Sequence, residues 1–364
     1  MIASHTVDNG NILIREFKIA KFVTLNRPRA LNAFSLGMVT GLIPFYKKWQ
    51  SEGNCVIVVD SSSPKVFSAG GDVKSIVCDS PKGVSQKFFR ECYGLNQFLH
   101  QLMPVHKIPH VSILNGITIG GGLGYAVQGS HRICTENTAA AMPECGIGFF
   151  PDVCASYFLP RLKPRCIGYY MALTGNSLSG ADVVRCGLGT NYVSSGKLDT
   201  LMSTLQQLEA VEDLQSVVNS AESTIEEGRF DFATDNEMSL LHDVFHQREN
   251  VEDVLNALSG HPNQEFTNPI MMKMLQNSPT SMKVTWELLR RATDERVTLT
   301  YADHVKLNYM LSQNFLKLTS DFREGVRARL VDKCNQPNWM PSALSDLYDE
   351  KVQMFFSSSE DNEK

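Results

Sequence analysis

The chain has 364 residues, of which 43% are apolar and 20% charged, and its formal net charge is −5 at neutral pH. This mildly acidic composition gives no electrostatic case for a nucleic-acid or membrane-surface partner. No apolar run approaches the roughly 18 residues that mark a transmembrane helix, and nine cysteines without a CxxC pair favour free thiols in a reducing compartment over a disulfide framework or a zinc site.

The N-terminal part of the chain alternates strand and helix patterns. Alternating residues over 12–26 predict two short strands with a turn near 17–20. The pattern then predicts, in order, a helix over 35–49, a strand covered on both faces over 55–59, a helix over 84–104, strands over 111–114 and 132–135, and two short helices between 164 and 189. Such an alternation indicates an α/β core with mostly parallel pairing over residues 1–195.

Beyond residue 195 the strand signals fade, and the remaining apolar residues recur at helical spacing. Residues 196–350 are therefore expected to form a helical C-terminal subdomain, and residues 351–364 a disordered acidic tail. The first ten residues, MIASHTVDNG, show neither a signal-peptide core nor a transit-peptide pattern. This start indicates either a cytosolic chain or a targeting segment outside this sequence.

Three consecutive glycines, Gly120 to Gly122, open a predicted helix after the buried strand over 111–114. A glycine turn at a helix start leaves backbone N–H groups without intrahelical partners, and such donors can hold an oxygen that gains negative charge. The alternative is a tight strand-to-helix turn that only allows close packing. A second glycine loop, around Gly71, follows the preceding strand, so one amide from each of two strand ends could converge on a single carbonyl oxygen.

Two acids, Glu144 and Asp152, lie among apolar neighbours in the loop after residue 135. Acidic side chains are rarely buried unless they are paired or employed. The acids and the glycine turn together therefore favour a catalytic site in this region.

Other motifs favour simpler interpretations. His242 and His246 have the spacing of a zinc-protease helix, but the glutamate base and a third ligand are missing, so no metal site is expected. No serine or cysteine has a base at the spacing of a nucleophile motif. The segment DFREGVRARLVDK contains three arginines, Arg323, Arg327 and Arg329. They are typical of a solvated helix face, and the alternative is that they bind the anionic tail of a cofactor.

Several segments resemble, in order and spacing, the motifs of the crotonase (enoyl-CoA hydratase/isomerase) superfamily. They are LNRPRALNAFS, VFSAGGDVKSI, GITIGGGLGYA and AAMPECGIGFFPDVCASYFLPRL. Within the superfamily the chain is most similar to the 3-hydroxyisobutyryl-CoA hydrolases, because SPTSMKVTWELL, DFREGVRARLVDK and PNWMP in the C-terminal half resemble them as well. The resemblance covers nearly the whole chain.

The resemblance implies a spiral of ββα turns with an acyl-CoA thioester bound across it. The thioester carbonyl would be held by the amides of Gly71 and Gly121, with no cofactor beyond the coenzyme A of the substrate. The implied coenzyme A contacts are Arg29, Ala69, Asp72 and Val73. The implied location is the mitochondrial matrix, with the cytosol or the peroxisome as alternatives, and association into a homo-oligomer is left open.

The acids argue for hydrolysis over hydration. Hydratases of the superfamily have a glutamate shortly after the glycine run, where this chain has Gly124, whereas Asp152 matches an aspartate of the hydrolases. In this interpretation Glu144 acts as a general base on water, or attacks the carbonyl to give a transient anhydride. Asp152 would bind a substrate hydroxyl or position the water. Cys92 stands where the hydrolases have a glutamate that touches substrate, so related branched or 3-hydroxyacyl groups stay alternatives.

Two rival functions remain at this point. A hydratase or isomerase acting on an unsaturated acyl-CoA is disfavoured by Gly124. A non-catalytic, hydrolase-like structural protein of the mitochondrial ribosome is disfavoured by the intact glycines and acids and by the absence of basic extensions.

Overall fold

The computed structural model describes residues 1–78, 83–225, 229–246, 248–294 and 296–357. The chain forms two compact units that interleave along the sequence. The sheet unit comprises Met1–Asp72, Gly94–Ala140 and Leu178–Phe232, and the helical unit comprises Val73–Tyr93, Ala141–Ser177 and Ala233–Lys364. The sequence pattern instead predicted one boundary near residue 195. Units of this kind follow packing and not chain order, so segments from both sides of residue 195 occur in each of them.

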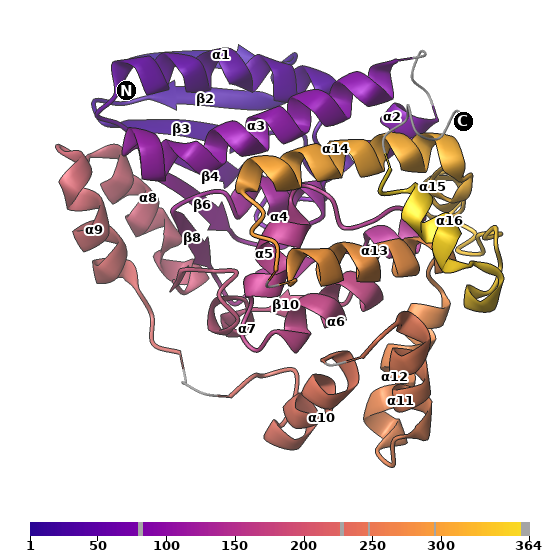
Figure 1. Cartoon of the computed structure of the whole chain (residues 1–364). Helices are drawn as coiled ribbons and strands as arrows, with labels where there is room; N and C mark the ends of the chain where they lie inside the picture. Colours follow the sequence, from indigo (N-terminus) through magenta and orange to yellow (C-terminus); the bar gives the residue numbers. More distant parts are fainter. Residues whose placement is uncertain (79–82, 226–228, 247, 295, 358–364) are drawn as a thin grey trace. The chain divides into compact units, whose positions relative to one another are not determined.

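The sheet unit is built on a seven-stranded sheet with the order β1-β2-β3-β4-β6-β8-β11 (Figure 1). Its strands are β1 (Ala3–Val7), β2 (Ile12–Glu16), β3 (Ala20–Leu25), β4 (Val56–Ser61), β6 (His110–Leu114), β8 (His131–Cys134) and β11 (Asn191–Tyr192). The first three strands pair antiparallel and all later pairs are parallel. The predicted hairpin and parallel core are confirmed, and β1 is an edge strand that the sequence pattern did not predict.

A second, smaller sheet positions the two glycine turns. Its order is β10-β9-β7-β5, with β5 (Val66–Ser68), β7 (Ile117–Ile119), β9 (Ala139–Ala141) and β10 (Leu178–Ser179). Because β5 and β7 are parallel neighbours, the loops that leave their carboxyl ends start from the same edge. One loop leads to Gly71, and the other leads through Gly120 into α4 (Gly121–Ala126), which confirms the predicted helix start.

Helices from distant parts of the chain pack on the large sheet. α1 (Leu36–Glu52) begins at Ser35, whose hydroxyl oxygen accepts a hydrogen bond from the backbone N–H of Met38 at 3.0 Å. The sheet unit also contains α7 (Ala181–Arg185), α8 (Leu198–Gln206) and α9 (Leu214–Ala221). Leucines of α8 and Val218 of α9 share one apolar core with strand residues of β3, β4, β6 and β8. These two helices were expected in a separate subdomain, but their apolar faces cover the sheet.

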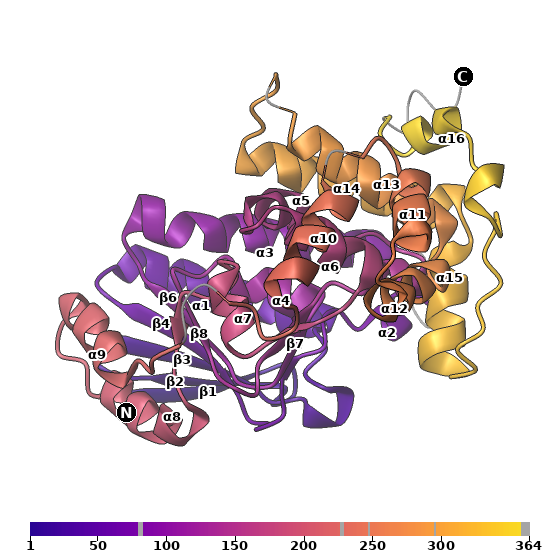
Figure 2. The ribbon, with the colours of Figure 1, turned by 90° about the horizontal axis from the view of Figure 1, so that it is seen from below.

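The helical unit contains most of the remaining helices (Figures 1 and 2). They are α2 (Val73–Val77), α5 (Ala155–Phe158), α6 (Cys166–Thr174), α10 (Asp235–Phe245), α11 (Val251–Gly260), α12 (Gln264–Leu275), α13 (Pro279–Ala292), α14 (Tyr301–Leu318), α15 (Asp321–Val326) and α16 (Asp349–Met354). The boundary between the units falls inside α3 (Val84–His106). Within the described part after residue 195 there is no strand, as the helical periodicity predicted.

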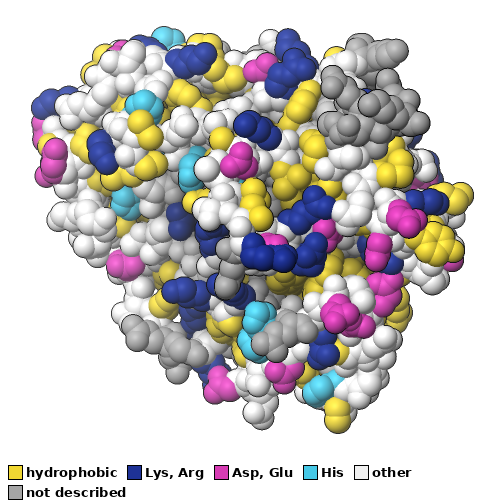
Figure 3. Space-filling view, in the orientation of Figure 1, with side chains coloured by type: hydrophobic (Ala, Val, Ile, Leu, Met, Phe, Trp, Pro, Cys, Tyr) yellow, Lys and Arg dark blue, Asp and Glu magenta, His cyan; other side chains and the backbone are white. Residues whose placement is uncertain are grey.

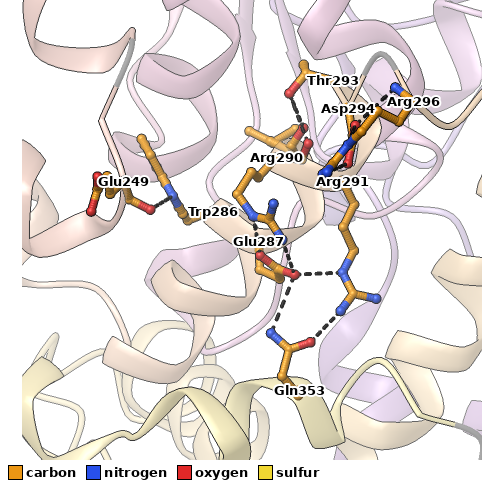
Figure 4. A network of polar contacts seen from close by, with 10 residues as sticks. Glu249, Trp286, Glu287, Arg290, Arg291, Thr293, Asp294, Arg296 and Gln353 are labelled. Atoms are coloured by element: carbon orange, nitrogen blue, oxygen red, sulfur yellow. Dashed lines mark hydrogen bonds and ion pairs between the residues drawn. The ribbon is translucent and has the colours of Figure 1, made fainter.

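A polar network joins α13 to the C-terminal helix α16. The carboxylate of Glu287, on α13, accepts hydrogen bonds from Arg290, Arg291 and Gln353 (Figure 4). Burial acts to raise the pKa of Glu287, but the two arginines outweigh it and the pKa is lowered. The network therefore ties α16 to α13 through an ionised carboxylate. α16 extends to Met354, inside the segment expected to be disordered, and residues 358–364 lie outside the described residues.

The cysteines other than Cys78 are free thiols, as expected. None of the helices in the described part of the chain is both long and apolar enough to cross a membrane. Basic, acidic and apolar side chains are interspersed over the face shown in Figure 3. Such a surface matches the mixed charge composition of the sequence.

Candidate active site

The amides of Gly71 and Gly121 lie side by side in the sheet unit. A methyl group built on Gly121 would lie 3.2 Å from the amide nitrogen of Gly71, and one built on Gly70 would lie 3.1 Å from the amide nitrogen of Gly121. Gly70 adopts φ +98°, a conformation that favours glycine. The structure thus brings together the two donors that the sequence predicted.

Both amides are available to a ligand. Gly71 and Gly121 are partly exposed, and within the described residues neither amide N–H donates a backbone hydrogen bond. In the adjoining segment, Phe34 is bridged to Gly71 because its N–H donates to Gly70 O at 2.8 Å and its carbonyl oxygen accepts from Asp72 N at 2.9 Å. Two unused donors at the end of one sheet have the composition of an oxyanion hole.

Buried polar groups fix the loop that carries Gly71. The Ser68 hydroxyl donates to the backbone oxygen of Asn32 at 2.9 Å and accepts from Gly70 N at 3.2 Å. The Asn32 amide group donates to Phe67 O at 3.0 Å, and its oxygen accepts from Arg27 N at 2.8 Å. These bonds satisfy the loop backbone from inside the protein, so its outward amides are left for a ligand.

The residues implied as coenzyme A contacts occupy the neighbouring loops. Arg29 is exposed on a single 3-10 turn, Pro28–Ala30, and Ala69 is partly buried, with its N–H donating to Leu31 O at 2.9 Å. Asp72 is partly buried and forms an ion pair with Arg27 at 2.8 Å. Val73, the first residue of α2, belongs to the helical unit and is partly buried. Their contacts with coenzyme A remain predictions.

Glu144 and Asp152 lie in the helical unit, on one segment called here the acid loop, residues 143–154. Glu144 begins a 3-10 turn and is 5% exposed, and Asp152 is 9% exposed. The phenol of Tyr93, on α3, donates to Asp152 Oδ2 at 2.8 Å. Glu144 Oε2 is buried and has no hydrogen-bond partner among the described residues. One acid is therefore held in place, and the other keeps an oxygen free for chemistry.

The acids influence each other's protonation. Burial, and after it the charge of Asp152, raises the pKa of Glu144 well above its ordinary value. Burial raises the pKa of Asp152 to about 7, although hydrogen bonds from Tyr93 and from backbone N–H groups act in the opposite direction. Two carboxyl groups with raised pKa values hold their protons to higher pH than ordinary carboxyl groups and can exchange them with water or substrate there.

Cys92 is a neighbour of the Asp152 carboxylate. The residue is partly buried, and burial, followed by the charge of Asp152, raises the pKa of its thiol. The thiol therefore stays protonated near neutral pH and can donate only a weak hydrogen bond. The surroundings of Asp152 are consequently less polar with Cys92 at this position than they would be with a glutamate in its place.

Two C-terminal helices, α14 and α15, contact the acid loop. A methyl group on Gly148 would lie 2.1 Å from Asp321 O of α15, and one on Gly325 of α15 would lie 2.3 Å from the carbonyl of Ile147. At the far end of the loop, the Cys154 N–H donates to the Asn308 side chain of α14 at 3.0 Å. The backbone there has a positive φ at two non-glycine residues, Val153 (47°) and Cys154 (62°), a strained geometry that this contact supports.

Tyr93 and Asn308 belong to the site but were not predicted from the sequence. Neither contact has a local signal, because Tyr93 is 59 residues and Asn308 154 residues from its partner. Phe149 is one of the apolar neighbours of the two acids. It stacks on Phe89 and Phe322 with ring centroids 5.5 and 4.2 Å apart, which gives the loop an apolar wall.

A cavity of about 440 Å³ lies in the helical unit between α2 and the α15 region. Lys74, Arg323 and Arg327 contribute positive charge to its wall. Arg327 is paired with Glu324 at 2.7 Å, and Arg323 is exposed, as expected for a solvated helix face. Lys74, which lines the cavity, directly follows Val73 in the sequence. The cavity therefore adjoins one of the implied coenzyme A contacts.

The chain matches the family described as enoyl-CoA hydratase/isomerase over residues 20–356. The curated protein named 3-hydroxyisobutyryl-CoA hydrolase, mitochondrial, from Gallus gallus is 36% identical over 99% of this chain and 92% of its own length. The proteins of the same name from Rattus norvegicus and Homo sapiens are 36% and 34% identical, and each alignment covers 98% of this chain and 91% of the relative.

Solved structures resemble the whole fold. A carnitinyl-CoA dehydratase from Mycobacterium thermoresistibile superposes with a TM-score of 0.84 at 28% identity, covering 95% of this chain and 96% of its own. An enoyl-CoA hydratase from Rhodobacter sphaeroides 2.4.1 gives a TM-score of 0.84 at 25% identity, covering 96% and 98%. Both relatives are named for reactions of coenzyme A thioesters.

Proposed function

This chain belongs to the enoyl-CoA hydratase/isomerase family, and from that premise we propose that it hydrolyses 3-hydroxyisobutyryl-CoA to 3-hydroxyisobutyrate and free coenzyme A, a step of valine catabolism. The observation that carries the proposal is the similarity, over almost the full chain, to relatives named for this hydrolysis. Two unpartnered amides and a buried carboxylate support the proposal, because thioester hydrolysis needs donors for an oxyanion and a base.

The amides of Gly71 and Gly121 hold the thioester oxygen in this proposal. When water attacks the carbonyl carbon, the carbonyl electrons move to the oxygen, and two fixed N–H donors stabilise the resulting negative charge. The C–S bond then breaks, its electrons leave with sulfur, and the coenzyme A thiolate takes up a proton.

Glu144 takes the proton from the attacking water. Its unpartnered Oε2 is free to accept that proton, and a carboxylate with a raised pKa is a stronger base once it is ionised. The alternative is attack by Glu144 itself, which forms an anhydride that water then opens. A single turnover in heavy-oxygen water tests for the anhydride. When water attacks the Glu144 side of the anhydride, the label enters Glu144 and both carboxyl oxygens of the product are unlabelled, whereas direct attack of water on the thioester puts one labelled oxygen into the product.

Asp152 and Cys92 select the acyl group. Asp152, fixed by Tyr93, accepts the hydrogen bond of a 3-hydroxyl, and the neutral Cys92 thiol leaves room for a methyl branch. Because Cys92 offers no charge, we expect closely related branched acyl groups to be accepted as well. The cavity beside α2 receives the phosphates of coenzyme A through Lys74 and Arg323.

A mitochondrial location is proposed because the relatives are named mitochondrial. No resident cofactor is proposed, since coenzyme A arrives as part of the substrate. Hydration of an enoyl-CoA is the second candidate function, favoured by the structural similarity to a solved enoyl-CoA hydratase. Gly124, which offers no acid after the glycine turn, counts against it.

The test is a panel of thioesters comprising 3-hydroxyisobutyryl-, isobutyryl- and methacrylyl-CoA. Free thiol release is followed with a colorimetric reagent, and the enoyl absorbance of methacrylyl-CoA is followed in parallel. We expect thiol release to be fastest with the hydroxylated substrate and the enoyl absorbance to change only through thioester cleavage. Loss of the double bond without thiol release would identify a hydratase and overturn the proposal.

A further inference from the structure

Three buried polar side chains form a hydrogen-bonded network in the sheet unit. They are Tyr46 of α1, His110 of β6 and Tyr125 of α4, and they are 0%, 1% and 3% exposed. The Tyr46 hydroxyl is hydrogen-bonded to His110 Nε2 at 3.0 Å and also to the Tyr125 hydroxyl. The proposed reaction uses none of the three, and no substrate can reach groups this deeply buried.

The network is neutral. Burial lowers the pKa of His110 to about 3, and burial raises the pKa values of both tyrosines. His110 Nδ1 is also buried without a hydrogen-bond partner among the described residues. Burying three polar side chains costs more free energy than burying apolar side chains in the same place. We therefore expect the network to fix a particular geometry on which function depends.

Tyr125 connects this network to both donors. It lies four residues after Gly121, so the two residues share one face of α4, one turn apart. Its ring also packs on Phe34, with ring centroids 5.1 Å apart, and Phe34 is the residue bridged to Gly71. Tyr125 thus belongs to the helix that begins at one amide, and its ring packs on the residue that is bridged to the other.

The α4 helix needs such an anchor. It has only six residues and begins at a glycine turn, so local helix formation alone gives it little rigidity. An oxyanion hole works only when both donors are held within about half an ångström of their place. The tie from Tyr125 through Tyr46 to His110 joins α4 to α1 and to a central strand of the large sheet.

We propose that Tyr125, held by Tyr46 and His110, is a positioning residue that fixes the spacing and direction of the Gly71 and Gly121 amides. This inference rests on the proposed function, because it assumes that the amides polarise a thioester carbonyl. The residue acts through the backbone and touches no reacting atom. Removing its hydroxyl therefore weakens carbonyl polarisation, and with it turnover, but leaves the affinity for the coenzyme A portion unchanged.

The experiment measures carbonyl polarisation directly. Isobutyryl-CoA isotopically labelled at the thioester carbonyl is bound to Glu144→Gln protein, and the carbonyl stretch is recorded by difference infrared spectroscopy. We expect binding to shift the stretch to lower frequency, and Tyr125→Phe added to this background to reverse at least half of the shift. In the otherwise wild-type chain, Tyr125→Phe should lower kcat about tenfold with KM within a factor of two, since small displacements of catalytic groups cost rate.

Two further variants make the result decisive. Tyr46→Phe removes the partner of Tyr125 and should reproduce both effects, and it serves as the test if Tyr125→Phe does not fold. Tyr170→Phe, which loses the partly buried hydrogen bond that the Tyr170 hydroxyl accepts from Asn176 in the helical unit, is the control and should change neither reading. A full carbonyl shift in Tyr125→Phe, or in Tyr46→Phe if only that variant folds, overturns the positioning role. No shift even with Tyr125 intact overturns the oxyanion hole itself.

Discussion

At the scale of single residues, the proposed chemistry depends on how Glu144 and Asp152 differ. Both are buried, but Asp152 receives the phenol of Tyr93 whereas one oxygen of Glu144 has no partner among the described residues. The charge of Asp152 is one of the causes that raise the pKa of Glu144. In the proposed reaction Asp152 therefore makes Glu144 more basic, in addition to contacting the substrate.

Asp152→Asn tests this coupling through the pH dependence of activity. Removing the charge lowers the pKa of Glu144, so the acid limb of the kcat profile should move to lower pH by about one unit or less. The measurement is kcat of both proteins as a function of pH, from about pH 5 to about pH 9. Asp243→Asn, at an exposed position in α10, is the control. An unmoved acid limb would contradict the coupling.

The same substitution also has a predicted effect on stability. The folded-state pKa of Asp152, about 7, lies above that of an unfolded aspartate, so the folded state binds the proton more tightly. Wild-type stability is therefore fully present below the unfolded pKa and falls as pH rises towards 7. The free energy of unfolding of Asp152→Asn, relative to that of the wild type, should therefore be roughly 1–4 kcal/mol higher at high pH than at low pH. Denaturant unfolding at acidic and alkaline pH measures the difference, and a constant difference would contradict it.

Gly121→Ala tests the donor pair without deleting an amide. Gly121 is the first residue of α4, where alanine favours the helix, but its methyl group would lie 3.2 Å from Gly71 N and cover that donor. We expect kcat to fall by about 10²–10³ while the melting temperature is kept. Gly94→Ala, at a helix position with no heavy atom within 4 Å, is the matched control. Normal turnover in Gly121→Ala would show that the thioester oxygen does not bind beside the Gly71 amide.

At the scale of elements, the C-terminal helices act as a support for the acid loop. Asp321 of α15 accepts from the Ser278 hydroxyl at 2.6 Å, and Asn277 donates to Leu173 O at 2.8 Å. The N–H of Ser278 donates to Cys145 O at 3.1 Å, directly beside Glu144. The start of α13 is therefore bonded both to α15 and to the loop that carries Glu144.

Gly325→Ala is predicted to disturb this support. Alanine favours a helix over glycine by about 1 kcal/mol, so local preference alone would stabilise α15. The added methyl group would lie 2.3 Å from the Ile147 carbonyl, however, and rigid backbone cannot yield cheaply. We expect a net loss of about 1–3 kcal/mol, as for overpacked cores, together with a lower kcat.

Gly260→Ala is the control for this prediction. Gly260 ends α11 in the same unit, and a methyl group added there would have no heavy atom within 4 Å. This variant should unfold at the wild-type denaturant concentration or slightly above it. If Gly325→Ala matched it in stability and in turnover, α15 would not support the acid loop.

At the scale of the whole molecule, local patterns predicted much of the fold. The N-terminal hairpin, the buried parallel strands and the helices all follow from apolar periods that each element carries within itself. Strands of two or three residues, such as β7 and β10, were missed because they are too short to show a period. The division into units was not predictable from periodicity, because an amphipathic helix such as α8 does not specify which apolar surface it covers.

The candidate site was predictable to a similar degree. The glycines and the two acids were named because their residue types in those contexts have few other uses. Tyr93, Asn308 and the Tyr46–His110–Tyr125 network were missed, because each depends on contacts between residues far apart in the sequence. The contacts of Arg29 and Val73 with coenzyme A stay predictions.

The central claim is that Glu144 acts on a thioester in a hydrolytic reaction, and Glu144→Gln tests it most directly. The measurement is thiol release from 3-hydroxyisobutyryl-CoA under saturating substrate, with the dissociation constant of the coenzyme A ester determined for the same samples. Glu209→Gln, which removes an exposed carboxylate paired with Lys18, is the control and should behave as wild type. We predict that Glu144→Gln lowers thiol release by about 10²–10⁴, the usual contribution of a general base, with ester affinity within a few-fold of wild type. Thiol release at the wild-type rate from a folded, ester-binding Glu144→Gln protein would contradict the account.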